Sequence, residues 1–275
     1  MPDNLPRTAD EKPALHATDL RTLSMCPVRY EFRRVKGIIA PPGIAMVVGT
    51  GVHKSVEHNM RSKMETGALV GISTLSDITR DSINEAFKQG VMLPKEEAAR
   101  GAKVLRGEAV DKGVTLSSLH REELAPVIKP VAVERTWRLG LEGYPMDLTG
   151  TIDLQEKDAI RDTKTTGKTP PKDVADKSQQ LTMYALGARY VDGKLPKKLH
   201  LDYLVHLKTP KAKTLTTERT EGDLDLLLRR VESAIRLIEH GSFMPCDPEN
   251  WWCSAKWCGY YDQCPYVKNP VTVGG

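Results

Sequence analysis

The sequence contains no long hydrophobic run. Its longest apolar stretch, residues 44–48, is far too short to cross a bilayer, and the first seven residues are polar and lack the apolar core of a signal peptide. These two absences argue against a membrane-embedded or secreted protein. We therefore expect a cytoplasmic protein with no membrane partner.

Cysteine is almost absent from the first 245 residues, where only Cys26 occurs. The other four, Cys246, Cys253, Cys258 and Cys264, crowd the last thirty residues. An odd number of cysteines without a secretory signal argues against a disulfide framework and favours metal or cluster ligation. The three thiols at spacings of five and six cannot complete a tetrahedral site, so the fourth ligand must be Cys26 or Cys246.

Aromatic residues are also scarce, at 5% of the chain, yet six of them lie within residues 251–266 among the cysteines. Aromatic rings in such a segment either pack around a cluster or stack on nucleic-acid bases. We favour packing around a cluster.

A nucleotide-binding Walker motif is missing as well. Residues 49–53 contain two glycines, but no glycine stands at the required spacing before Lys54. The comparison with a phosphate-binding P-loop therefore fails. The formal charge of +4 is mildly basic, which permits nucleic-acid binding but is much weaker than the charge of a dedicated basic binder.

The length of 275 residues suits one large domain or two modest ones. We expect residues 1–14, which carry three prolines, to be a disordered lead-in. Residues 15–275 are then one domain with a helical insert at about 76–125. Strand patterns occur at 130–139, 148–155, 159–164, 199–207 and 214–219, and helical patterns at 173–191 and 223–240. This order predicts an α/β fold with a mixed sheet covered by helices.

The hairpin predicted at 148–155 and 159–164 carries the chemistry. Asp162 and Lys164 are two residues apart, so they share one face of their strand, beside Asp153 on the neighbouring strand. Two carboxylates that converge with a lysine suit a metal-dependent hydrolytic site, in which the acids hold a hard cation and the ammonium orients water. Taken alone, these residues more often form a solvated hairpin edge, but the rest of the chain favours the site.

Other polar residues follow helical or strand spacing near this hairpin. His53 lies beside an apolar stripe on a predicted helix, although a single histidine there is more often structural than a ligand. Gln180 and Tyr184 lie four residues apart and therefore share a helix face. Glu134, on the preceding strand, is a weaker candidate acid.

Together these motifs resemble the PD-(D/E)XK nuclease superfamily, specifically its iron-sulfur branch, which includes the RecB and AddB nuclease domains and CRISPR-associated exonucleases. The similar segments are Cys26-Pro-Val-Arg-Tyr, Gly49-Thr-Gly-Val-His53, Gly150-Thr-Ile-Asp153, Asp162-Thr163-Lys164, Gln180-Leu-Thr-Met-Tyr184 and the closing cysteine triplet. Each is weak alone, but six in the right order argue against coincidence.

The resemblance implies a restriction-endonuclease-like fold and a metal-dependent DNA nuclease, an exonuclease in replication, recombination or repair. It implies that His53, Asp153 and Asp162, with the main-chain carbonyl of Thr163, bind Mg²⁺ or Mn²⁺. It also implies that Lys164 activates or positions water. In the family, the residues that correspond to Gln180 and Tyr184 steady the lysine and the DNA backbone.

The resemblance further implies a 4Fe-4S cluster that clamps the two ends of the domain. Its ligands would be Cys26, Cys253, Cys258 and Cys264, with Cys246 outside. The four residues between Cys253 and Cys258 exceed the two often seen in the family, so zinc stays open as the occupant.

The expected partner is DNA, as single strands or duplex ends, together with a separate helicase or recombination protein. A competing interpretation is a non-catalytic nucleic-acid-binding module with a four-cysteine zinc site and a purely structural acidic hairpin. The joint presence of a histidine, two aspartates and a lysine favours the enzyme, because a binding module has no need of anionic groups that face phosphates.

Overall fold

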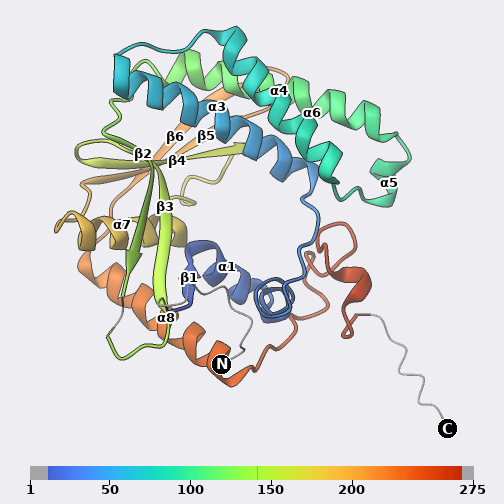
Figure 1. Ribbon diagram of the computed structural model, residues 1–275, viewed down its shortest axis with the longest axis vertical. Coiled ribbons are helices and arrows are strands. Elements are labelled where there is room, and N and C mark those ends of the chain that lie inside the picture. The colour runs from blue at the N-terminus through green and yellow to red at the C-terminus, as the bar shows by residue number, and fades with distance from the viewer. Residues whose placement is uncertain (1–11, 141, 268–275) are drawn as a thin grey trace.

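The computed structural model describes residues 12–140 and 142–267, which form a six-stranded mixed sheet with helices on both faces (Figure 1). One face is covered by α3 (Ile44–Thr66), α4 (Ile72–Gln89) and α6 (Ala102–Leu119). The other is covered by α1 (Ala17–Met25), α7 (Gln179–Val191) and α8 (Glu221–His240). The predicted α/β fold is confirmed.

The strands are β1 (Ala14–His16), β2 (Ala132–Leu139), β3 (Asp147–Gln155), β4 (Ala159–Thr166), β5 (Lys198–Val205) and β6 (Lys211–Thr217). Five of them follow the predicted ranges closely. The exception is β1, because three residues are too few to show an alternating pattern. Of the predicted disordered lead-in, residues 1–11 lie outside the described residues, and Ala14 begins β1.

Strand β3 is the centre of the sheet and has three neighbours. Along one edge it pairs antiparallel with β2 over nearly its whole length. Along the other edge it pairs with β1 at residues 147–149 and with β4 only at residues 154 and 155. Residues 150–153 of β3 are therefore unpaired on that edge, and β3 and β4 diverge there. This divergence leaves room between two strands that otherwise belong to one sheet.

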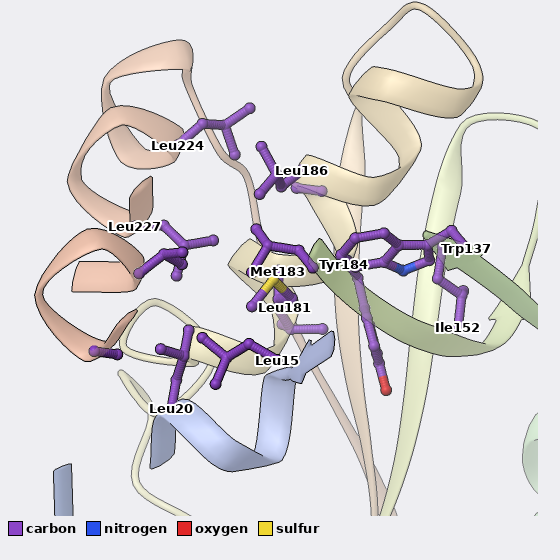
Figure 2. Close-up of a cluster of buried hydrophobic side chains, with 14 of the residues drawn as sticks. Leu15, Leu20, Trp137, Ile152, Leu181, Met183, Tyr184, Leu186, Leu224 and Leu227 are labelled. Carbon is purple, nitrogen blue, oxygen red and sulfur yellow. The ribbon is translucent and has the colours of Figure 1, made fainter. Parts of the chain in front are cut away.

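The larger hydrophobic core lies between the sheet and α1, α7 and α8. Figure 2 shows leucines from α1, α7 and α8 gathered in it, with Trp137 and Ile152 at its sheet side. Helix α7 is buried along most of its length, and Ser178 caps its start by accepting a hydrogen bond at Oγ from Leu181 N. This cap places the beginning of α7 six residues later than the predicted helix.

The second core lies on the opposite face, between the sheet and α3, α4 and α6. Ile83 of α4 and Leu116 of α6 are fully buried against α3 and the sheet. The segment predicted as a helical insert is therefore a packed layer of the fold. It also contains the short helices α5 (Lys95–Ala98) and η2 (His120–Leu124). No described helix has both the length and the hydropathy that a bilayer crossing needs.

The cysteine-rich segment packs against the N-terminal helices α2 (Pro27–Tyr30) and η1 (Glu31–Val35), and it contains the short helix η3 (Tyr261–Gln263). Figure 1 shows this red segment beside the blue start of the chain. Trp252 Nε1 donates to the carbonyl of Met25 at 3.2 Å, and the Tyr260 ring stacks on Phe32 with centroids 5.2 Å apart. The two ends of the described chain therefore support each other.

A close contact between α7 and the sheet generates a stability prediction. A methyl group on Gly187 would lie 2.4 Å from Trp137 Cε2. We expect Gly187→Ala to destabilise the protein by about 1–3 kcal/mol, because overpacking forces the helix or the ring to move. Urea denaturation measures this change.

Gly107→Ala is the matched control, because this glycine lies inside α6 with nothing within 4 Å of the added methyl group. The control is expected to gain up to about 1 kcal/mol from helix propensity. Equal effects of the two substitutions would contradict the proposed contact.

Candidate active site

The three central residues of the predicted site lie where β3 and β4 diverge. Asp153 is in the unpaired part of β3, and Asp162 and Lys164 follow on β4. Asp162 is 1% exposed, whereas the side chains of Asp153 and Lys164 are partly open to solvent. The site therefore has a buried floor and an accessible rim.

A chain of hydrogen bonds joins the lysine to both aspartates. Lys164 Nζ donates to Asp162 Oδ1 at 3.0 Å and to Gln180 Oε1 at 2.8 Å. Gln180 Nε2 then donates to the Tyr184 hydroxyl at 2.7 Å, and that hydroxyl donates to Asp153 Oδ1 at 3.4 Å. Figure 2 shows the Tyr184 hydroxyl directed away from the leucines of the core. Helix α7 thus fixes both β-strand acids from one side.

His53 closes the arrangement from α3 on the other side. Its Nδ1 lies 3.2 Å from Asp153 Oδ2, and its Nε2 lies 2.5 Å from the carbonyl oxygen of Thr163. The structure therefore brings together all seven residues that the sequence predicted for the site.

Gly51, two residues before His53, explains part of the glycine-containing motif. A Cβ atom there would lie 2.9 Å from Ile83 Cγ1 and 3.2 Å from the Thr79 carbonyl oxygen. The absence of a side chain lets α3 and α4 approach closely. The position of α3, and hence of His53, depends on this contact.

Burial sets the electrostatics of the floor. Desolvation raises the pKa of Asp162 to about 6, because it outweighs the opposing effect of the Lys164 charge. Burial lowers the pKa of His53, but its hydrogen bond to Asp153 and the charges of both aspartates outweigh burial, so that its pKa is raised. The two oxygen atoms that face the ring, Asp153 Oδ2 and the Thr163 carbonyl oxygen, therefore both favour its protonated form when no metal ion is bound.

The donor set fits a hard divalent cation. Asp153 Oδ2 and Asp162 Oδ2 are buried. They lie 3.2 Å from His53 Nδ1 and 2.7 Å from Lys164 Nζ, respectively. Carboxylate and carbonyl oxygens with one imidazole suit Mg²⁺ or Mn²⁺. Within the described residues no three acidic, histidine or cysteine side chains are already arranged around one point. Metal binding would release the His53 proton, because a ligating imidazole must be neutral.

Glu134, a weaker candidate acid in the sequence, lies next to Asp153 in the structure. It stands opposite Asp153 in the β2–β3 pair, where the register is interrupted, and its φ of 51° is unusual for a residue with a side chain. Burial raises its pKa to about 7, and the charges of Asp153 and Glu57 add to this shift. No local pattern in the sequence reveals such a backbone distortion.

Arg161, which lies beside Asp162 on β4, was not predicted as a residue of the site. Arg161 Nη1 donates to Asp202 Oδ2 on β5 at 2.9 Å, and its Nε donates to Glu156 Oε2 at 2.6 Å. Asp202 is 1% exposed. This buried Arg161–Asp202 pair holds β4 at the point of divergence. In the sequence, the only indication of the pair is a charged residue next to the Asp162-x-Lys164 motif.

All five cysteines line one cavity of about 80 Å³ between α2 and the C-terminal segment. Cys26 is buried at the end of α1. Burial raises the pKa of Cys246 to about 12, and hydrogen bonds and charge from Cys26 and Cys253 contribute to this shift. The cavity therefore gathers the predicted ligands, and it also contains Cys246, which the predicted cluster leaves out.

A mixed sheet whose central strands diverge around two aspartates and a lysine is the arrangement expected of a phosphodiester-hydrolysing enzyme. The model of the PD-(D/E)XK nuclease superfamily matches residues 14–265. The chain belongs to this superfamily and is a nuclease.

Solved structures match the chain at low sequence identity, and the first of those that follow shares its fold. The crystal structure of a candidate exonuclease from Eubacterium rectale is 14% identical, with 94% of this chain and 91% of that chain covered and a TM-score of 0.54. A phage-related exonuclease from Haemophilus somnus is 14% identical, with coverages of 68% and 94% and a TM-score of 0.33. No curated protein matches the chain.

The raised pKa of Asp162 generates a prediction on stability. The folded chain holds this proton more tightly than the unfolded chain, whose ordinary carboxyl pKa is 3.8. The stability of the metal-free parent should therefore fall as pH rises through the range between these values. We expect Asp162→Asn to be more stable than the parent at pH 7 by about 1–3 kcal/mol, and to lose this pH dependence.

Thermal unfolding in a chelating buffer at pH 4.5 and pH 7 measures this difference. Asp173→Asn is the control, because Asp173 is exposed and ion-paired to Lys177. That substitution should change stability little at either pH. An Asp162→Asn protein that is less stable than the parent at pH 7 would show that the ion pair with Lys164 outweighs desolvation.

Proposed function

We propose that this nuclease is a divalent-metal-dependent exonuclease that hydrolyses phosphodiester bonds in DNA, in replication, recombination or repair. The observation that carries the proposal is the unbroken chain of contacts from His53 through Asp153, Tyr184 and Gln180 to Lys164 and Asp162. A purely structural acidic hairpin would not need partners from two helices on opposite faces of the sheet.

The residues divide the chemistry between them. Asp153, Asp162, His53 and the carbonyl of Thr163 are the groups that would hold Mg²⁺ or Mn²⁺, and the cation would supply positive charge to the scissile phosphate. Lys164 contacts Asp162 and Gln180, and its side chain is 34% exposed, so that the ammonium can still reach a water molecule or a phosphate oxygen. Tyr184 and Gln180 hold these groups in place.

The choice of an exonuclease that acts on DNA rests on likeness. The Eubacterium rectale protein that shares the fold is described as a candidate exonuclease. The sequence motifs are most similar to those of nucleases that act on DNA ends. The chain has no motif of a helicase, so we propose a separate helicase or recombination protein as a partner.

We expect hydrolysis of end-labelled DNA to require Mg²⁺ or Mn²⁺ and to be lost in Asp153→Ala, Asp162→Ala and Lys164→Ala. The losses should be non-additive, because the three groups act in one transition state. Rates of nucleotide release from single-stranded, double-stranded and covalently closed circular DNA measure activity, and resistance of the circle separates end-dependent from internal cleavage.

His53→Ala serves as a graded control. A missing neutral ligand weakens metal binding but leaves the carboxylate charge, so we expect part of the activity to return at high Mn²⁺ concentration. An Asp162→Ala protein that degrades DNA at a rate near the parent's would refute the assigned site.

We also propose that Cys26, Cys253, Cys258 and Cys264 hold a 4Fe-4S cluster. The sulfur-lined cavity and its apolar surroundings support this assignment. Arg29 lines the same cavity with a buried Nε that has no acceptor, and its charge opposes the burial that raises the pKa of Cys258. A cationic side chain there suits a negatively charged thiolate cluster.

Cys26→Ser should purify pale, contain little iron and melt at a lower temperature, because a link from residue 26 to residue 264 restricts nearly the entire unfolded chain. By analogy with a disulfide, that restriction contributes roughly 5 kcal/mol. Cys246→Ser should stay brown and melt near the parent. The opposite pair of results would move the ligand from Cys26 to Cys246.

The metal content of the purified protein tests the competing function of a non-catalytic module with a zinc site. Iron with acid-labile sulfide, together with metal-dependent hydrolysis, supports the enzyme with its cluster. Stoichiometric zinc without hydrolysis would favour the binding module instead.

A further inference from the structure

A hollow of about 460 Å³ opens directly beside the site, and Lys164 and Gln180 form its border with the proposed reaction centre. Its walls come from α1, the start of α7, β5 and α8. The volume lies within the range of sites that bind small molecules or single units of a polymer. The hollow is therefore large enough to hold one nucleotide of a strand whose phosphate lies at Lys164.

The charge of this hollow has one sign. Its lining includes Arg21, Lys164, Lys177 and Arg230, and none of the described residues that line it is an aspartate or glutamate. Arg21 has no carboxylate partner among the described residues. Within residues 12–140 and 142–267, Arg230 donates only to Ser24 Oγ, at 3.2 Å. Two guanidinium groups are thus available to an anion, whereas Lys177 is already paired with Asp173.

An aromatic ring lies on the floor of the hollow. Tyr203 of β5 is the register partner of Lys164 in the parallel β4–β5 pair, so the two side chains project from the same face of the sheet. Tyr203 is only partly buried, and its hydroxyl makes no hydrogen bond within the part of the chain that the structure describes. A ring beside two arginines offers a face for stacking and two cations for a phosphate.

A second hollow continues from the first, between α1 and α8. The two share Ser24 and Arg230, and the second is also lined by Arg229 and by leucines of both helices. The surface from Lys164 outward is therefore a continuous track with basic groups along it. A flexible chain of phosphates fits such a track better than an isolated small molecule does.

We propose that the hollow binds the nucleotide next to the scissile phosphate, with its base on Tyr203 and its phosphate at Arg21 and Arg230, and that the strand continues between α1 and α8. This inference rests on the proposed nuclease function and names the substrate contacts of that same site. Base stacking is tolerant of sequence, and arginine–phosphate contacts are salt-dependent, so the strand is held without base specificity.

Binding and turnover are measured separately, so that the pocket and the proposed function can fail independently. Affinity for an internally labelled single-stranded oligonucleotide is measured by fluorescence anisotropy at several salt concentrations. The Asp162→Asn background prevents hydrolysis during this measurement. The steady-state constants KM and kcat are measured in the otherwise unaltered protein.

We expect Arg21→Ala and Arg230→Ala each to weaken binding about fivefold or more at low salt. Each should also reduce the slope of log affinity against log salt by about 0.7, the value for one phosphate contact on a single strand. Arg21→Lys should preserve that slope. In turnover, KM should rise while kcat stays within about twofold of the parent, because these residues position the strand and do not touch the reacting atoms.

Substitutions of Tyr203 test whether a base stacks on its ring. Tyr203→Leu should weaken binding about tenfold, and Tyr203→Phe should retain it, because the ring alone carries the contact. The affinities of both proteins are then measured for a series of oligonucleotides, each of which lacks the base at one position. When the missing base is the one that stacks on Tyr203, Tyr203→Leu and the parent should bind equally well. A difference that persists at every abasic position would refute stacking on one base.

Arg106→Ala is the matched control, because Arg106 is an exposed arginine of α6 that does not line either hollow. Substitutions at Arg21 and Arg230 that affect affinity and salt slope no more than Arg106→Ala would overturn the proposal. If these substitutions weaken binding but the unaltered protein hydrolyses no DNA, the pocket stands and the nuclease assignment to DNA fails. If the unaltered protein hydrolyses DNA but the substitutions in the hollow leave binding unchanged, the nuclease function stands and the proposed pocket fails.

Discussion

The site depends on one ion pair, between the buried carboxylate of Asp162 and the partly exposed ammonium of Lys164. A carboxylate with 1% exposure is expensive to keep charged, and the lysine two residues along the same strand offsets part of that cost. The lysine is in turn held by Gln180 of α7. Loss of any one of these groups leaves a buried polar atom without its partner, so strand and helix are coupled through the chemistry of the site.

The local parts of this arrangement could be predicted from the sequence. Alternation placed Asp162 and Lys164 on one strand face, and the spacing of four placed Gln180 and Tyr184 on one helix face, because both signals depend only on residues that are close along the chain. The sheet class followed from the order of the elements. The family resemblance supplied the grouping of these pieces, which no local pattern contains.

What could not be predicted is non-local. The divergence of β3 and β4 arises because β1 and β4 pair with opposite ends of the same edge of β3, and β1 is too short to be seen in the sequence. The strained backbone of Glu134 and the pairing of Arg161 with Asp202 likewise depend on neighbours far away along the chain. The position of Cys246 inside the sulfur-lined cavity is a further case, because sequence distance gave no reason to include or exclude it.

The contact between the two ends of the described chain has a consequence for folding. Helix α1 forms one wall of the hollow beside Lys164, and the segment that follows it is covered by residues 246–264, with Trp252 bonded to Met25 across 227 residues of sequence. Contacts of such long sequence separation form slowly. The cover of the N-terminal helices is therefore encoded far beyond both aspartates and the lysine. A truncation before residue 246 would keep every residue of the proposed metal site and still expose the apolar side chains around Phe32.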